Sequence, residues 1–129
     1  MIKINNKEYN NYDIEITWGD FDVVSNGEKR KGSAPFIIFN IENNIFIGIE
    51  TIISKDMWKN MNLNTKVNIE RYISDITYKD EAGWISIITG KYNCNILRIS
   101  EKEFKIEFCV ESEEIDEINI IIDDVIVLF

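Results

Sequence analysis

The sequence predicts an all-β protein, either an antiparallel β-sandwich or a flattened barrel of about nine to ten strands with one short helix near 55–61. Isoleucine occurs 27 times and proline once, and β-branched side chains favour the pleated surface of a strand. Short apolar segments also follow one another closely, separated by turns that contain asparagine or glycine. The length of 129 residues fits a single domain over 1–129.

The first elements are expected to be a small hairpin and a longer strand. Asn5-Asn6 suits a tight turn because asparagine tolerates positive φ, and pairing across this turn opposes Ile2 to Tyr9. Residues 12–18 alternate strictly between apolar and polar side chains. This period of two indicates a strand with one buried face.

A charged loop and an apolar hairpin are expected next. Residues 25–35 combine turn-forming residues with four charges and lack an apolar anchor, so we expect an exposed loop. The apolar segments 36–41 and 45–53 flank two asparagines. A two-residue turn there opposes Phe39 to Gly48, where the ring would fill the gap left by the glycine.

One short helix is predicted near 55–61. Ser54 is a typical N-cap residue, and Met57, Trp58 and Met61 follow it at spacings of one and three residues. This spacing gives one apolar stripe over about two turns. The stripe is expected to cover the core.

The segment after this helix is predicted to be one long bent strand followed by a hairpin. From Lys66 onward the apolar residues change parity, which is typical of a β-bulge, here near Ser74. Residues 80–83 have the composition of a tight turn closed by glycine. The register across that turn opposes Tyr78 to Ile85, apolar against apolar.

The last strands are expected to form a hairpin and a paired final strand. Segments 93–99 and 104–110 are expected to pair across residues 100–103, and the second segment is apolar on alternate positions, with Phe104, Ile106, Phe108 and Val110 inward. In a symmetrical register Cys94 faces Cys109 on the outer side, but a reducing compartment favours two free thiols over a disulfide. Segment 118–129 is apolar on both parities, so we expect it to be paired and covered.

Enzymatic activity is not expected. The sequence contains no histidine, which removes the Ser/His and Cys/His nucleophile pairs, the usual zinc and iron ligand sets and the best proton-transfer group near neutral pH. Two cysteines alone make a weak metal site. We therefore expect no catalytic residue, no cofactor and no metal.

Nucleic acid and membranes are not expected partners. The basic run at 28–32 lacks the glycine spacing and the ending of a phosphate-binding loop, and the net charge of −9 repels a polyanion. No apolar run reaches the length of a membrane span, and residues 1–4 have the pattern of a strand and not of a signal peptide. These observations predict a cytoplasmic protein.

Acidic side chains are concentrated near the C-terminal end. Residues 1–100 hold 13 acidic and 12 basic side chains, whereas residues 101–129 hold 10 acidic and 2 basic ones, a net charge of −8. Clustered carboxylates repel one another unless a positively charged group lies close to them. We therefore expect the partner-binding residues to be Glu111, Glu113, Glu114, Asp116, Glu117, Asp123 and Asp124, with Trp84 as an aromatic anchor.

Three functions are consistent with these features. The first is an acidic inhibitor or immunity-type protein that masks a basic partner protein. The second is a tail-type structural subunit of a phage or mobile element, which assembles as a homo-oligomer. The third is a small-molecule-binding β-barrel, which would need a cavity that an isoleucine-rich core tends to fill.

Overall fold

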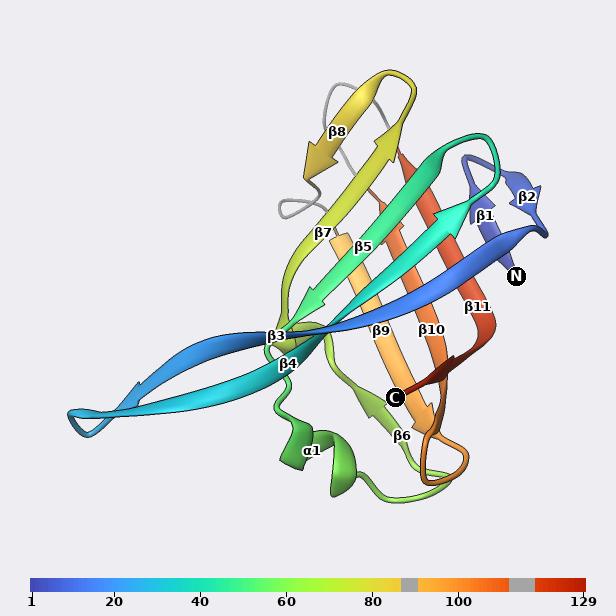
Figure 1. Ribbon diagram of the computed structural model, residues 1–129. Coiled ribbons are helices and arrows are strands. Elements are labelled where there is room, and N and C mark those ends of the chain that lie inside the picture. Colours follow the sequence, from blue (N-terminus) through green and yellow to red (C-terminus); the bar gives the residue numbers. More distant parts are fainter. Residues whose placement is uncertain (87–90, 112–117) are drawn as a thin grey trace.

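The computed structural model describes residues 1–86, 91–111 and 118–129 and shows a β-sandwich of two antiparallel sheets (Figure 1). The six-stranded sheet has the spatial order β2 (Lys7–Tyr9), β1 (Ile2–Ile4), β11 (Asn119–Leu128), β10 (Glu103–Glu111), β9 (Lys91–Arg98) and β6 (Lys66–Asn68). The five-stranded sheet has the order β3 (Tyr12–Ser25), β4 (Glu28–Ile41), β5 (Ile45–Thr51), β7 (Ile73–Asp80) and β8 (Gly83–Ser86). The all-β prediction is confirmed, with eleven strands among the described residues.

Two predicted hairpins have the expected register. Ile2 lies opposite Tyr9 across the turn at Asn5 and Asn6, and both asparagines have positive φ. Tyr78 lies opposite Ile85 in the β7–β8 hairpin. Local turn chemistry and side-chain alternation were sufficient to determine these two pairings.

The predicted register of the β4–β5 hairpin is wrong by one residue. The loop has three residues, 42–44, and its two asparagines both have positive φ. Phe39 therefore lies opposite Ile47 and not opposite Gly48. Both side chains are fully buried, and the predicted register would have paired an inward residue with an outward one. Gly48 is covered by the ring of Phe36.

The predicted long strand from Lys66 is also wrong, because β6 and β7 belong to different sheets. A 3₁₀ helix, η1 (Glu70–Tyr72), connects them. The predicted bulge is present: Glu50 pairs with Asp75 and Thr51 with Ile73, which leaves Ser74 as the extra residue. The change of parity thus reflected both a bulge and a crossing between the sheets.

Helix α1 (Lys55–Lys59) is shorter than predicted and begins at the predicted cap. The Ser54 hydroxyl accepts a hydrogen bond from the Met57 backbone N–H at 3.3 Å, which satisfies one of the helix's free donors. Trp58 is buried in the core and Met61 packs against it. Met57 is exposed, so the prediction that it faces the core as part of the apolar stripe is wrong.

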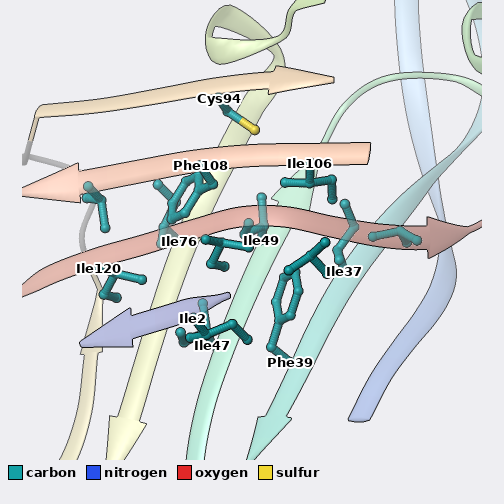
Figure 2. Close-up of a cluster of buried hydrophobic side chains, with 14 of the residues drawn as sticks. Ile2, Ile37, Phe39, Ile47, Ile49, Ile76, Cys94, Ile106, Phe108 and Ile120 are labelled. Atoms are coloured by element: carbon teal, nitrogen blue, oxygen red, sulfur yellow. The ribbon is translucent and has the colours of Figure 1, made fainter. Parts of the chain in front are cut away.

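The core lies between the two sheets and consists mainly of isoleucine and phenylalanine (Figure 2). Buried side chains from β1, β9, β10 and β11 meet those from β4, β5 and β7. The largest fully buried side chains are Phe39, Phe104, Phe108, Ile2, Ile37, Ile47, Ile49, Ile53, Ile69, Ile76 and Ile96. Each such side chain stabilises the fold by about 1.5–3 kcal/mol relative to full exposure.

Strand β11 is paired on both sides, with β1 and with β10, as predicted. Its inward residues are buried in the core. Its outward residues Ile121, Ile126 and Leu128 are exposed. The expected cover is therefore present only on the inner face.

Candidate functional site

A two-stranded arm, residues 19–34, extends away from the sandwich (Figure 1). It consists of the second half of β3 and the first half of β4, which pair in continuous register from Gly19 opposite Ala34 to Ser25 opposite Glu28. The predicted exposed loop at 25–35 is therefore wrong. Asn-Gly is the strongest short hairpin signal, and this signal outweighed the charges that suggested a loop.

The turn at the tip of the arm has the geometry of a type I′ hairpin. Asn26 has a φ of 53° and Gly27 a φ of 79°, and type I′ turns require positive φ at both central residues. The twist of this turn matches the right-handed twist of the two strands. The turn therefore allows the two strands to stay paired up to the tip of the arm.

Pro35 explains why the arm separates from the rest of its sheet. The β4–β5 ladder begins at Phe36 and does not continue toward the arm. Proline has no backbone N–H and cannot donate to a ladder. The Pro35 carbonyl instead accepts a hydrogen bond from the buried Thr51 hydroxyl at 3.0 Å. Beyond this point β4 pairs only with β3.

The arm carries two backbone edges that pair with no strand among the described residues. The residues that flank a type I′ turn form a hydrogen-bonded pair, and such pairs then alternate with non-hydrogen-bonded pairs. The N–H and C=O groups of Asp20, Asp22 and Val24 therefore point outward from β3. Outward groups on an unpaired edge are a template for strand addition.

The acidic residues predicted as a partner surface are only partly described. Glu111 and Asp123 are exposed, on β10 and β11. Asp124 is also exposed, next to Asp123. Four members of the predicted set lie outside the described residues: Glu113, Glu114, Asp116 and Glu117.

Trp84, the predicted anchor, lies on a different sheet from the described carboxylates. It belongs to β8, at the edge of the five-stranded sheet, opposite Lys79. Asp123 and Asp124 lie on β11 in the six-stranded sheet. The side chain of Trp84 is outside the described part of the chain, so the proposed anchor stays a prediction.

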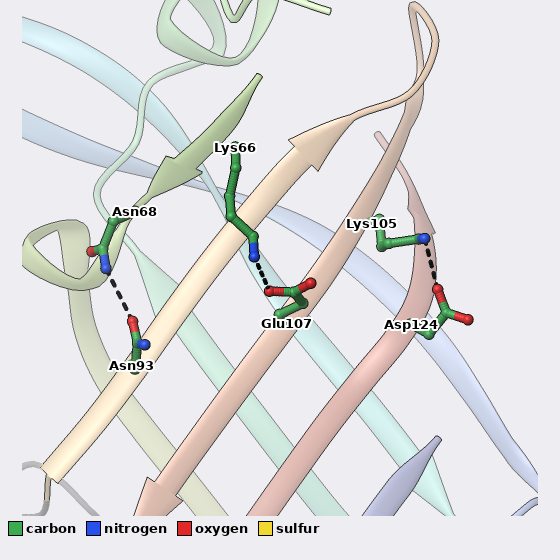
Figure 3. A network of polar contacts seen from close by, with 6 residues as sticks. All are labelled: Lys66, Asn68, Asn93, Lys105, Glu107 and Asp124. Carbon is green, nitrogen blue, oxygen red and sulfur yellow. Dashed lines mark hydrogen bonds and ion pairs between the residues drawn. The ribbon is translucent and has the colours of Figure 1, made fainter. Parts of the chain in front are cut away.

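Lysines neutralise part of the acidic face of the six-stranded sheet (Figure 3). Lys105 Nζ lies 2.7 Å from the Asp124 carboxylate, and Lys66 Nζ lies 2.7 Å from the Glu107 carboxylate. The hydrogen bond and the charge of Lys105 lower the pKa of Asp124, and the same contact raises the pKa of Lys105. Lys105 is already part of the net charge of −8, whereas Lys66 lies outside residues 101–129 and offsets one further carboxylate on this face.

A β-bulge positions Asp124, and the sequence contained a signal for it. Ile106 pairs with Val125 but Phe108 pairs with Ile122, so two residues of β11 oppose one residue of β10. Asp124 has a φ of 58°, a conformation that aspartate tolerates better than most residues. The signal is the change of apolar parity between Ile122 and Val125.

The two cysteines do not face each other. Cys94 lies opposite Phe108, and Cys109 lies opposite Asn93. Cys94 points into the core and Cys109 is exposed, so both are free thiols on opposite faces of the sheet. The predicted symmetrical register is wrong by one residue. Burial raises the pKa of the Cys94 thiol to about 12, with a smaller contribution from the charge of Glu70.

Ranges 1–86, 91–111 and 118–129 hold no group of three or more cysteine or carboxylate side chains that could bind a metal ion. Within the same ranges no helix is long and apolar enough to cross a membrane.

Comparison of the chain with protein-family models, with curated proteins and with solved structures finds no match. The function is therefore inferred from the geometry of the arm and the charged face alone.

Proposed function

We propose that this protein is a non-enzymatic structural subunit that assembles with copies of itself through the projecting arm. The observation that carries the proposal is the arm itself, residues 19–34, whose two strands pair only with each other among the described residues. An isolated two-stranded ribbon is marginally stable in water. A partner strand would complete its hydrogen bonding.

A second copy of the chain offers edges for such pairing. Strands β2 and β6 end one sheet and β3 and β8 end the other, each with one neighbour in the described structure. A contact between the arm of one copy and a different edge of the next is heterologous, and heterologous contacts build rings or filaments. In concrete terms, the proposed protein is a tail-type subunit of a phage or mobile element that assembles in the cytoplasm.

The test compares the size of three proteins by light scattering after gel filtration. The wild type is expected to form a concentration-dependent oligomer. A variant in which residues 20–33 are replaced by Asn-Gly joins Gly19 to Ala34, the pair at the base of the arm, by a two-residue turn. We expect this variant to be monomeric with an unchanged circular dichroism spectrum of the sandwich.

A second variant keeps the arm and blocks its edges. Asp22→Pro and Lys31→Pro together remove one outward N–H from each strand, because these two residues form a non-hydrogen-bonded pair. This double variant should also be monomeric. A monomeric wild type at high concentration, or an oligomer that survives both arm variants, would overturn the proposal.

Masking of a basic protein is a second candidate function. The net charge of −8 over residues 101–129 favours it, together with the exposed Glu111 and Asp123. Opposite charge speeds encounter, and salt screens it over about 10 Å at 0.1 M ionic strength. The matched test is capture of a partner encoded beside this gene, by wild type and by Glu113→Lys with Glu114→Lys and Asp116→Lys. Salt-independent capture, or equal capture by the charge-reversed variant, would contradict this candidate.

A further inference from the structure

A pocket of about 260 Å³ lies at the end of the sandwich where α1 covers the sheets. Its walls come from β3, α1, β9, β10 and the residue that follows β11. Pockets for drug-sized ligands measure about 300–1,000 Å³. The size of this pocket therefore suits a smaller molecule with one aromatic ring.

Four aromatic side chains line the pocket. Trp58 stacks on Phe129 with ring centroids 4.3 Å apart, and Phe104 meets both rings edge-on at 5.2 Å and 5.0 Å. Trp18 meets Phe129 edge-on, with ring centroids 6.1 Å apart. Such a cluster offers ring faces and edges to a further aromatic group.

The charged side chains of the pocket are mostly cationic. Lys55, Lys59 and Arg98 line it together with one carboxylate, Glu101. This gives a local charge of +2 on a protein whose net charge is −9. A cleft with low-dielectric walls and one dominant sign of charge concentrates ligands of the opposite sign.

The guanidinium of Arg98 is a structural part of this pocket. It donates to the backbone carbonyls of Lys59, Met61, Ser100 and Glu101 at 2.7–3.1 Å. These bonds tie the end of α1 to the β9–β10 turn and hold the positive charge in place. Lys55 and Lys59 are exposed and four residues apart on α1, so both side chains lie on the same side of the helix.

Trp58 supplies an unused hydrogen-bond donor. Its side chain is 3% exposed, and its indole Nε1 has no hydrogen-bond partner among the residues that the structure describes. A buried donor without an acceptor costs about 1–3 kcal/mol, and such a group calls for an explanation. Nε1 has less than 1 Å² of exposed surface, so an acceptor atom on a bound ligand would supply the missing partner once the Trp58 ring shifts toward the pocket.

We propose that this pocket binds a small aromatic carboxylate, with its ring against the half-buried Trp18 and Phe129 and its carboxylate near Lys55 and Lys59. The aromatic walls select the ring and the lysines select the negative charge. Trp58 Nε1–H becomes a donor to a carboxylate oxygen once its ring shifts and exposes that atom. The proposal does not depend on the arm or on self-assembly.

The test is a titration of the full chain with benzoate. The titration is monitored through the proton and nitrogen NMR signals of the tryptophan indole N–H groups. Trp58→Phe identifies the Trp58 signal, which should move downfield as Nε1–H gains an acceptor. Benzyl alcohol and benzylamine have a similar shape and are neutral and cationic, and acetate has the charge without the ring. Benzoate should bind at least tenfold more tightly than each of the three.

Two charge variants separate specific recognition from a general effect of charge. Lys55→Gln with Lys59→Gln should weaken benzoate binding about tenfold and leave benzyl alcohol binding unchanged. Lys7→Gln with Lys29→Gln changes the net charge equally at exposed sites on β2 and β4, and should bind benzoate as the wild type does. The proposal is wrong if benzoate leaves the Trp58 signal unchanged, binds no better than benzyl alcohol, or binds the Lys55/Lys59 variant as tightly as the wild type.

Discussion

The arm and the sandwich are both built from antiparallel strands, yet they differ in what holds them together. In the sandwich, Phe39 and Ile47 face each other across a ladder and are both fully buried between the two sheets. In the arm, Val24 lies in an equally regular ladder but is 67% exposed. Hydrogen bonding between strands is similar in the two regions. We therefore expect the sandwich to be more stable than the arm, because only the sandwich has a second layer.

The sharpest test of this comparison is the truncation of one apolar side chain in each region. Phe39→Ala should lower the free energy of unfolding by about 3–5 kcal/mol, because it removes a fully buried ring and leaves a cavity. Val24→Ala should change it by less than about 0.5 kcal/mol. Urea denaturation measures both, and equal losses would show that the arm is part of the cooperative core.

A glycine in the sandwich should matter next most. A Cβ added to Gly48 would lie 2.8 Å from the Cε2 atom of Phe36 and 3.0 Å from the Cε1 atom of Phe46. Both rings must shift, so Gly48→Ala should cost about 1–2 kcal/mol of global stability in denaturant melts. A neutral result would mean that the rings of Phe36 on β4 and Phe46 on β5 move aside freely.

The buried thiol gives a pH test of the core. Because folding raises the pKa of Cys94 from 9.0 to about 12, the neutral thiol contributes its full stability below about pH 9 and loses it as the pH rises toward 12. Its share of the unfolding free energy should fall by about 1.4 kcal/mol between pH 8 and 10. Denaturation of the wild type and Cys94→Ala at both pH values measures this difference.

The exposed thiol is the matched control for that experiment. Cys109→Ala should keep the alkaline loss of stability, because Cys109 lies on the outer face of the sheet. If Cys109→Ala loses the pH effect and Cys94→Ala keeps it, then Cys109 and not Cys94 is the buried thiol.

The smallest global effect is expected at the tip of the arm. Gly27 has a φ of 79°, so Gly27→Ala should strain the turn by about 1 kcal/mol. This cost should fall on local opening of the arm and leave the global unfolding midpoint unchanged. Hydrogen exchange should show amides of residues 19–34 exchanging about fivefold faster, with β10 unaffected. A shift of the global unfolding midpoint would instead show that the arm unfolds together with the sandwich.

Local patterns in the sequence determined the fold class, the Ser54 cap and several pairings. Alternation of period two and isoleucine content predict strands because they depend only on neighbouring side chains. The hairpin that pairs Ile2 with Tyr9 and the bulge at Ser74 were predicted for the same reason. A turn and its flanking residues contain all the information that these features need.

The tertiary structure decided the features that depend on distant residues. The crossing through η1 depends on the sheets that β6 and β7 join, β6 beside β9 in one and β7 beside β5 in the other. Loop length set the register of Phe39, and the β9–β10 pairing put Cys94 in the core. Side chains from β3, α1, β9 and β10 form the aromatic pocket only after the sheets pack, so no local pattern in the sequence could predict it.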